Sequence, residues 1–311
     1  MVNALVFIEP SSGGLPVTDI LDIAIGTITM RPYVFAFFTA YLVAAVPHLG
    51  WKKTLLFTVA GYLIAFASEY SSINTGFPYG WYYYVDTTRD RELWVAGVPF
   101  FDSLSYVFLT YCSYATALLV LGPVKKAGRD LVLLETGRLR RSFSVLFLAS
   151  LFQVFLDIVT DPVALQGSRW FLGRIYGYKE VGAHFGIPLS NYLGWLLVSA
   201  LLVAALQLID RFGGRGEEKP AGVAAPPLRA FYGPFLYLCV IAFNLTVTLY
   251  IGERLMAITG FFIYTLPIAM AGVLLFQKVD RYHKDELAAH LAEFPWSNAT
   301  STGSGRPGAS N

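Results

Sequence analysis

Residues 142–163 read SFSVLFLASLFQVFLDIVTDPV, and this stretch decides the fold class. It contains no Lys or Arg, and its only acidic residues, Asp157 and Asp161, fall in its last third. A helix needs about 20 mainly apolar residues to cross the hydrocarbon core of a bilayer. The stretch is therefore predicted to be a membrane-spanning helix, with two acidic groups near one end.

The rest of the chain repeats this character. Of its 311 residues, 55% are hydrophobic and 14% are charged, against roughly 25% charged in soluble domains. Six further apolar stretches are long enough to span: roughly 27–47, 53–71, 98–121, 188–209, 231–251 and 256–277. The first is interrupted by Arg31-Pro32, which predicts a kinked or interfacial start. We expect an all-α, polytopic transmembrane bundle of about seven helices.

The loops indicate its orientation. With seven spans, 16 of the 23 Lys and Arg residues fall on one side, and that side is predicted to be cytoplasmic. We therefore expect an N-terminal segment (1–26) outside, a seven-helix domain (27–280) and a cytoplasmic tail (281–311) that is disordered from about residue 298.

Acidic and amide side chains gather toward the opposite, non-cytoplasmic end. They are Glu69, Asp102, Asp157, Asp161 and Asn191, near the ends of four different spans. A carboxylate in hydrocarbon costs about 2.5 kcal/mol or more. Asp157 and Asp161 are four residues apart and share a helix face. The structural alternative is that Asp161, which precedes a proline, ends its helix, and that Asp102 lies hydrated among headgroups. General acid–base chemistry is the functional interpretation.

Two long loops at the same end, 72–97 and 165–187, are rich in Trp, Tyr, Phe and Gly. An aromatic belt at the headgroups explains such residues, and so does a lid over a pocket that opens into the membrane. The density of WYYY at 81–84 favours some of them lining a site.

Other chemistry has little support in the sequence. The four histidines form neither an HExxH nor an HxxxH pair, so no metal site is predicted. There is no Gly-rich phosphate loop, and the net charge of +2 does not indicate nucleic acid binding. A rhodopsin would need a lysine in the middle of the last span, and 256–277 has none.

Four motifs, in this order and spacing, carry a resemblance. They are EYSSINTGFPYGWYYY (69–84), GVP (97–99), the segment from Leu156-Asp157 to Asp161-Pro162, and GIPLSNYLGW (186–195). Together they resemble the CruF-type carotenoid hydratases, a family of membrane carotenoid biosynthesis proteins, over about residues 30–280. The segment after GVP departs from the family pattern, since FFDSLSYVF replaces a helix start with Pro and Trp.

The resemblance implies hydration of the terminal C=C bond of an acyclic carotenoid end to a tertiary alcohol, without a cofactor. The partners it implies are a carotenoid substrate, membrane lipid and other carotenoid biosynthesis enzymes, in the cytoplasmic membrane of a bacterium or archaeon. One of Asp157 and Asp161 would be the general acid, with Glu69 or the other aspartate as its partner. The expected substrate-binding residues are Asn191, which would orient the water, and Tyr79, Trp81, Tyr82, Asp102 and Trp195.

Three alternatives remain open at this point. The same acid with water excluded would cyclise or isomerise the end group. A proton-coupled transporter would relay protons through the carboxylates, although the last two spans have few polar residues to match them. A non-catalytic scaffold or carotenoid-binding subunit would not need the carboxylates for pigment production.

Overall fold

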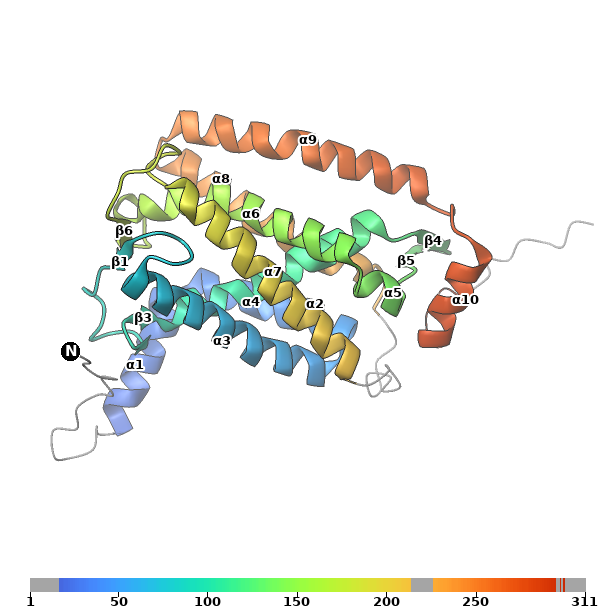
Figure 1. Ribbon diagram of the computed structural model, residues 1–311, viewed down its shortest axis with the longest axis horizontal. Helices are drawn as coiled ribbons and strands as arrows, with labels where there is room; N and C mark the ends of the chain where they lie inside the picture. The colour runs from blue at the N-terminus through green and yellow to red at the C-terminus, as the bar shows by residue number, and fades with distance from the viewer. Residues whose placement is uncertain (1–16, 214–225, 295–296, 298, 300–311) are drawn as a thin grey trace, which may run out of the picture.

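The computed structural model describes residues 17–213, 226–294, 297 and 299 (Figure 1). In this part of the chain, seven helices are long and apolar enough to cross a membrane. They are α2 (Pro32–Leu49), α3 (Trp51–Thr75), α4 (Phe100–Leu121), α6 (Phe143–Leu165), α7 (Leu189–Phe212), α8 (Tyr232–Tyr250) and α9 (Arg254–Lys278). The predicted seven-helix transmembrane bundle is confirmed.

Helix α4 is the centre of the bundle. Of its most apolar stretch, 78% is buried inside the protein, against 11% for α9. It packs against α3, α6, α8 and α2, and α7 closes the other side of α3 and α6. Helix α9 runs along the edge of the bundle (Figure 1), so most of its apolar surface is left for lipid.

The predicted first span, 27–47, is divided in two. Helix α1 (Val17–Met30) ends before Arg31, and α2 starts at Pro32. Proline has no N–H group, so it is accepted at the first turn of a helix and not inside one. The span therefore begins five residues later than predicted, and α1 projects away from the bundle (Figure 1).

Proline is accepted within α6 for a different reason. Pro162 cannot donate to the carbonyl of Ile158, four residues earlier. The Nε2 atom of His184 lies 3.2 Å from that carbonyl and bonds it instead. Helix α6 therefore continues to Leu165, and Asp161 stays within the helix and does not end it.

Short elements cover the two ends of the bundle. One end holds β1 (Tyr82–Tyr84), β2 (Trp94–Val95), β3 (Val98–Pro99), η1 (Gly167–Arg169) and β6 (Tyr176–Tyr178). We call it the acidic end, because Glu69, Asp102, Asp157 and Asp161 lie there. The other, the basic end, holds β4 (Val124–Ala127), β5 (Asp130–Leu133), α5 (Gly137–Arg140), η2 (Arg229–Phe231) and α10 (Lys284–Glu293).

The strands form three antiparallel pairs: β1 with β6, β2 with β3, and β4 with β5. Within the predicted N-terminal segment 1–26, residues 1–16 lie outside the described residues and the remainder belongs to α1. The tail predicted to be disordered from about residue 298 also lies outside them, apart from Ala299.

Candidate active site

The predicted acidic residues and Asn191 come from four helices that pack against one another. Glu69 is on α3, Asp102 on α4, Asp157 and Asp161 on α6, and Asn191 at the start of α7. Their positions at the same end of antiparallel helices bring them to one level of the bundle.

Asn191 joins the two aspartates of α6. Its Nδ2 atom donates to Oδ2 of Asp157 at 2.8 Å and to Oδ2 of Asp161 at 2.9 Å. An amide nitrogen has two hydrogens, so both bonds can form at once. Asn191 and Asp157 are 3% and 2% exposed, so the bridge is shielded from solvent.

The two bridged carboxyl groups have different surroundings. Asp161 also accepts from the hydroxyl of Tyr176 at 2.5 Å on Oδ1 and from that of Tyr178 at 2.8 Å on Oδ2. Among the described residues, Oδ1 of Asp157 is buried and has no hydrogen-bond partner. Three donors therefore face one carboxyl group and a single donor faces the other.

A second acidic pair lies on α3 and α4. Glu69, 2% exposed, accepts from Ser103 Oγ at 2.5 Å. Asp102 accepts from the Tyr84 hydroxyl at 2.6 Å. Tyr84 and Tyr106 also lie beside the Glu69 carboxyl group.

The β1–β6 pair supplies the tyrosines above both acidic pairs. Tyr82 faces Tyr178 and Tyr84 faces Tyr176, so the alternation of a strand puts all four rings on one face. On the other face, the ring of Tyr83 covers Gly177, where a Cβ atom would come within 2.8 Å of its hydroxyl.

Burial, together with the charge of Asp161, raises the pKa of Tyr176 and of Tyr178 well above the usual range. Burial and Asp102 raise the pKa of Tyr84 in the same way. These phenols therefore stay protonated at neutral pH and act as donors to the carboxylates.

An aromatic group lies on the inner side of the tyrosine face. Tyr106 and Trp195 stack with centroids 4.4 Å apart and planes 3° apart. The Tyr79 ring lies 6.0 Å from Trp195, and its hydroxyl bonds Ser68 Oγ at 3.0 Å. Gly194 permits this packing, because a Cβ atom there would come within 2.7 Å of the Pro78 carbonyl oxygen and of the Tyr79 ring.

Of the predicted site residues, the structure groups all but Trp81. Its side chain is 44% exposed, and the Lys179 ammonium group lies 4.2 Å from its ring centroid. Tyr82 is 7% exposed and contacts the rings of Tyr79 and Tyr84. Trp81 directly precedes β1, and its carbonyl accepts from the Lys179 N–H at 3.1 Å, so it continues the alternation of the strand on the face opposite Tyr82.

Sequence reasoning missed several residues of this site: Tyr84, Ser103, Tyr106, Tyr176 and Tyr178. The alternation Tyr-Gly-Tyr at 176–178 was a usable signal for a strand with one aromatic face. Which carboxyl group each tyrosine would reach was not readable from local sequence.

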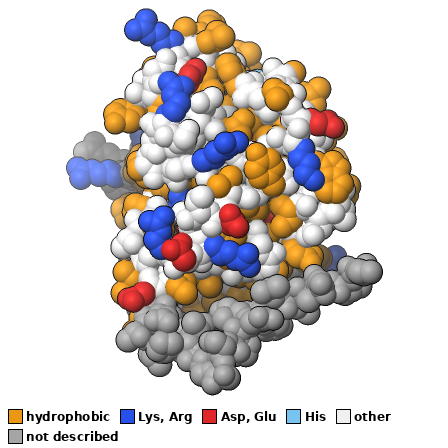
Figure 2. Space-filling view, turned by 90° about the vertical axis from the view of Figure 1, so that its left-hand side faces the viewer, with side chains coloured by type: hydrophobic (Ala, Val, Ile, Leu, Met, Phe, Trp, Pro, Cys, Tyr) orange, Lys and Arg blue, Asp and Glu red, His pale blue; other side chains and the backbone are white. Residues whose placement is uncertain are grey.

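The carboxyl groups of the site are beneath the surface. Figure 2 looks onto the acidic end, where Lys and Arg side chains are interspersed with apolar ones and a few Asp and Glu. The exposed basic residues of these loops include Arg89, Arg91 and Lys179. Glu69 and Asp157, by contrast, are almost fully covered.

A buried ion pair fixes the loop beside the site. Arg31 binds Glu92 through two bonds, 3.0 Å from Nε to Oε2 and 2.9 Å from Nη2 to Oε1. Its guanidinium group also lies 4.5 Å from the ring centroid of Phe101 and donates to the carbonyl of Leu172. The break between α1 and α2 is thereby tied to both long loops of the acidic end.

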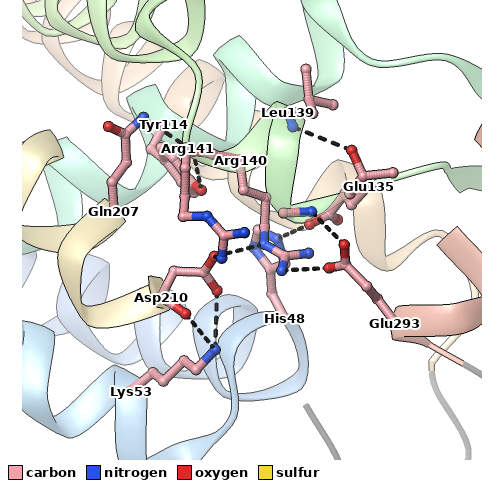
Figure 3. A network of polar contacts seen from close by, with 12 residues as sticks. His48, Lys53, Tyr114, Glu135, Leu139, Arg140, Arg141, Gln207, Asp210 and Glu293 are labelled. Atoms are coloured by element: carbon pink, nitrogen blue, oxygen red, sulfur yellow. Dashed lines mark hydrogen bonds and ion pairs between the residues drawn. The ribbon is translucent and has the colours of Figure 1, made fainter. Parts of the chain in front are cut away.

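The basic end has a polar cluster of its own, which sequence reasoning did not anticipate (Figure 3). Asp210 accepts from Lys53 Nζ at 3.0 Å and from Arg140 Nε at 3.1 Å. Arg140 also donates to Glu293 of α10 at 2.9 Å. The cluster therefore joins α3, α5, α7 and α10.

His48 extends this cluster to α4. Its two ring nitrogens lie 3.1 Å from the Tyr111 hydroxyl and 3.0 Å from Glu135 Oε2. Burial alone would raise the pKa of Glu135, but His48 and Arg140 outweigh it and lower that pKa to about 2. The Glu135 carboxylate is therefore ionised throughout the physiological range.

Comparison with known proteins places this arrangement in a family. The family model for carotenoid biosynthesis proteins matches residues 26–267. The bisanhydrobacterioruberin hydratase of Haloarcula japonica is 28% identical over 221 residues, which are 69% of this chain and 64% of that protein. The chain thus spans less than two thirds of that relative's length, and no solved structure matches it. Since the family model covers most of the chain, this protein belongs to the carotenoid biosynthesis protein family.

Proposed function

We propose that the protein is a carotenoid hydratase, which adds water to the terminal C=C bond of an acyclic carotenoid end group. One observation supports this above others. Asn191 bridges a hydrogen-bonded carboxyl group, Asp161, and a buried one with a free oxygen, Asp157. Alkene hydration needs an acid and a base side by side, and the similar protein of Haloarcula japonica is a hydratase.

We assign the acid to Asp157 and the base to Asp161. Hydrogen bonds that donate to a carboxylate favour its ionised form. Asp161 accepts three such bonds, from Tyr176, Tyr178 and Asn191. Asp157 accepts one, and its Oδ1 atom has no donor among the described residues, so that oxygen is the place for a proton.

The reaction then proceeds in two steps. Asp157 gives its proton to the less substituted carbon of the terminal double bond, which leaves a tertiary carbocation on the neighbouring carbon. Water attacks the cation through its oxygen, and the protonated alcohol loses a proton to Asp161. The proton returns from Asp161 to Asp157 through water, so each turnover adds one water molecule and consumes no net proton.

The aromatic group of the site would stabilise the cation. Aromatic faces attract cations, most strongly where water is excluded. Tyr79 lies beside Tyr82 of the tyrosine face and beside Trp195, and the carboxyl groups of Glu69 and Asp102 lie nearby. We propose that the end group binds among these rings while the polyene extends into the bilayer.

The experiment is pigment analysis in a bacterial host that makes an acyclic carotenoid such as lycopene. The wild-type chain should yield a hydroxylated carotenoid, and Asp157→Asn and Asp161→Asn should abolish it. Asp90→Asn is the matched control, because Asp90 is exposed at the same end of the protein. A wild-type chain that yields no hydroxylated pigment would count against the activity, and full activity in both site variants would remove the pair from the mechanism.

One feature favours a second candidate, an end-group cyclase or isomerase. The tyrosines of β1 and β6 cover the pair, and exclusion of water from the cation would let it lose a proton or close a ring. Analysis of the product separates the two, since only hydration adds the mass of water.

We also propose that the acidic end faces outward. Most Lys and Arg residues of the loops belong to the other end, which is then cytoplasmic. In the variant Asp90→Cys, a membrane-impermeant thiol reagent should label the cysteine in intact cells. Labelling only after lysis would reverse the orientation.

A further inference from the structure

Polar atoms without partners extend from the acidic site into the middle of the bundle. Among the described residues, the buried side-chain atoms with no hydrogen-bond partner include Asp157 Oδ1, Gln153 Nε2, Ser113 Oγ and Ser199 Oγ. The last three residues are 0% exposed. A bilayer offers such groups no water from outside, so bound internal water is the usual explanation for them.

Other hydroxyl groups of the same helices differ from these serines. Ser150 Oγ on α6 donates to the carbonyl of Leu146 at 2.8 Å. Thr116 on α4 donates to the carbonyl of Cys112 at 2.7 Å. A Ser or Thr hydroxyl inside a helix can bond a carbonyl of the preceding turn in this way. Ser113 and Ser199 do not, so their orientations suit a partner in the bundle interior.

These unpaired polar atoms lie at successive depths along the axis of the bundle. Gln153 lies one turn from Asp157 on the same face of α6, toward the basic end. Its Oε1 atom accepts from Thr110 of α4 at 3.1 Å, which leaves the amide nitrogen as the unpaired donor. Ser113 is one turn farther along α4, and Ser199 is about 12 Å along α7 from Asn191.

We propose that a file of internal water molecules binds along these atoms and supplies the water that the reaction consumes. The first molecule lies between Asp157 Oδ1 and Gln153 Nε2, and others bind at Ser113 and Ser199. Asp157 Oδ1 and Gln153 Nε2 offer the first molecule two polar partners, and each serine hydroxyl offers one further partner along the file. This inference rests on the proposed hydratase function, whose second substrate is water.

The surroundings of the pair explain why a store of water is useful. On its outer side, Tyr176, Tyr178 and Asn191 already use their donors on the two carboxyl groups. An apolar polyene end would close the lateral side when it binds. Water held on the inner side of Asp157 then replaces the molecule used in each turnover.

Radiolytic footprinting of the full chain in lipid nanodiscs tests the file without any assay of activity. Hydroxyl radicals formed from bound water oxidise side chains next to it. Three side chains that should be oxidised are each adjacent in sequence to a residue of the file and at most 2% exposed: Cys112, Leu156 and Val198. Leu236 of α8, 3% exposed, is the matched control and should not be oxidised. Equal, background oxidation of all four would overturn the proposal.

Substitutions then test whether the file supplies water to the reaction. Gln153→Leu and Ser199→Ala should lower the hydration rate about five- to tenfold through loss of one hydrogen bond to water, and should reduce oxidation of Leu156 or Val198. Ser150→Ala removes a hydroxyl of equal size and burial and should change neither. Wild-type rates in Gln153→Leu and Ser199→Ala would refute the supply.

The two proposals fail separately. If buried side chains are oxidised but the wild-type chain makes no hydroxylated product, the hydratase function is wrong and the water file stands. If hydration occurs without oxidation of those side chains, the file is wrong and the function stands.

Discussion

Substitution of Asn191 is the most direct test of the proposed mechanism. Among the described residues, the Asn191 side-chain nitrogen is the one group hydrogen-bonded to both aspartates of the pair, so Asn191→Ala removes two hydrogen bonds at once. The change leaves both carboxyl groups in place, and any loss of rate reports on their arrangement.

The expected magnitude follows from the two contacts. A hydrogen bond to an ionised group contributes about 1.5–3 kcal/mol and one to a neutral group about 0.5–1.5 kcal/mol. With Asp161 ionised and Asp157 protonated, the sum is about 2–4.5 kcal/mol, and water that enters the space recovers part of it. We expect a loss of about 2.7 kcal/mol, which is roughly a hundredfold decrease in hydration rate.

The assay is the rate of formation of hydroxylated carotenoid by protein in lipid nanodiscs, with a thermal unfolding curve for each variant. Asn244→Ala is the matched control. Asn244 is a buried asparagine of α8, 7% exposed, whose amide donates to the carbonyl of Val240 on its own helix at 2.9 Å. Its replacement should leave the rate within about twofold of wild type. If Asn191→Ala stays within threefold of wild type, or if both variants lose activity equally, the bridge has no catalytic role.

Three further predictions concern other contacts. Tyr178→Phe removes one donor to Asp161 and should slow hydration about tenfold, whereas Tyr83→Phe on the opposite face of the β1–β6 pair should not; similar rates for the two would refute the arrangement. Glu92→Gln leaves a buried guanidinium group without its counter-charge and should destabilise the protein by about 3–5 kcal/mol in thermal unfolding, and an unchanged midpoint would contradict the buried ion pair. Because the folded-state pKa of Glu135 is lowered to about 2 from 4.5, its contribution to stability is complete above about pH 4.5 and is lost as the pH falls toward 2; the unfolding midpoint should therefore drop over this range in wild type and less in Glu135→Gln.

Buried carboxyl groups have different partners at the acidic end and at the basic end. At the basic end, Asp210 is paired with Lys53 and Arg140, and Glu135 is bonded to His48. At the acidic end, the carboxyl groups of the site are bonded to hydroxyl and amide groups and to no Lys or Arg among the described residues. The first arrangement suits a fixed structural junction, and the second suits groups that exchange protons.

Trp81 is a residue whose predicted place in the site could not be judged from the local sequence. Its place in the WYYY stretch favoured contact with substrate, and the structure puts it at the surface under Lys179. Strand alternation separates neighbouring residues onto opposite faces, so Trp81 and Tyr82 cannot both face the site. A short strand within a loop is not visible in hydropathy, which is why the assignment needed the β1–β6 register.

The sequence by itself determined that the chain crosses a membrane with seven helices and that its acidic residues lie toward one end. Both follow from local properties, because the free energy of inserting a segment depends on its own composition and the level of a residue depends on its place in that segment. Only the tertiary structure decided that Asn191 bridges Asp157 and Asp161, that Tyr176 and Tyr178 hold Asp161, and that α10 joins the basic end. Such contacts depend on how helices rotate and pack against one another, and residues far apart in the chain set that packing together.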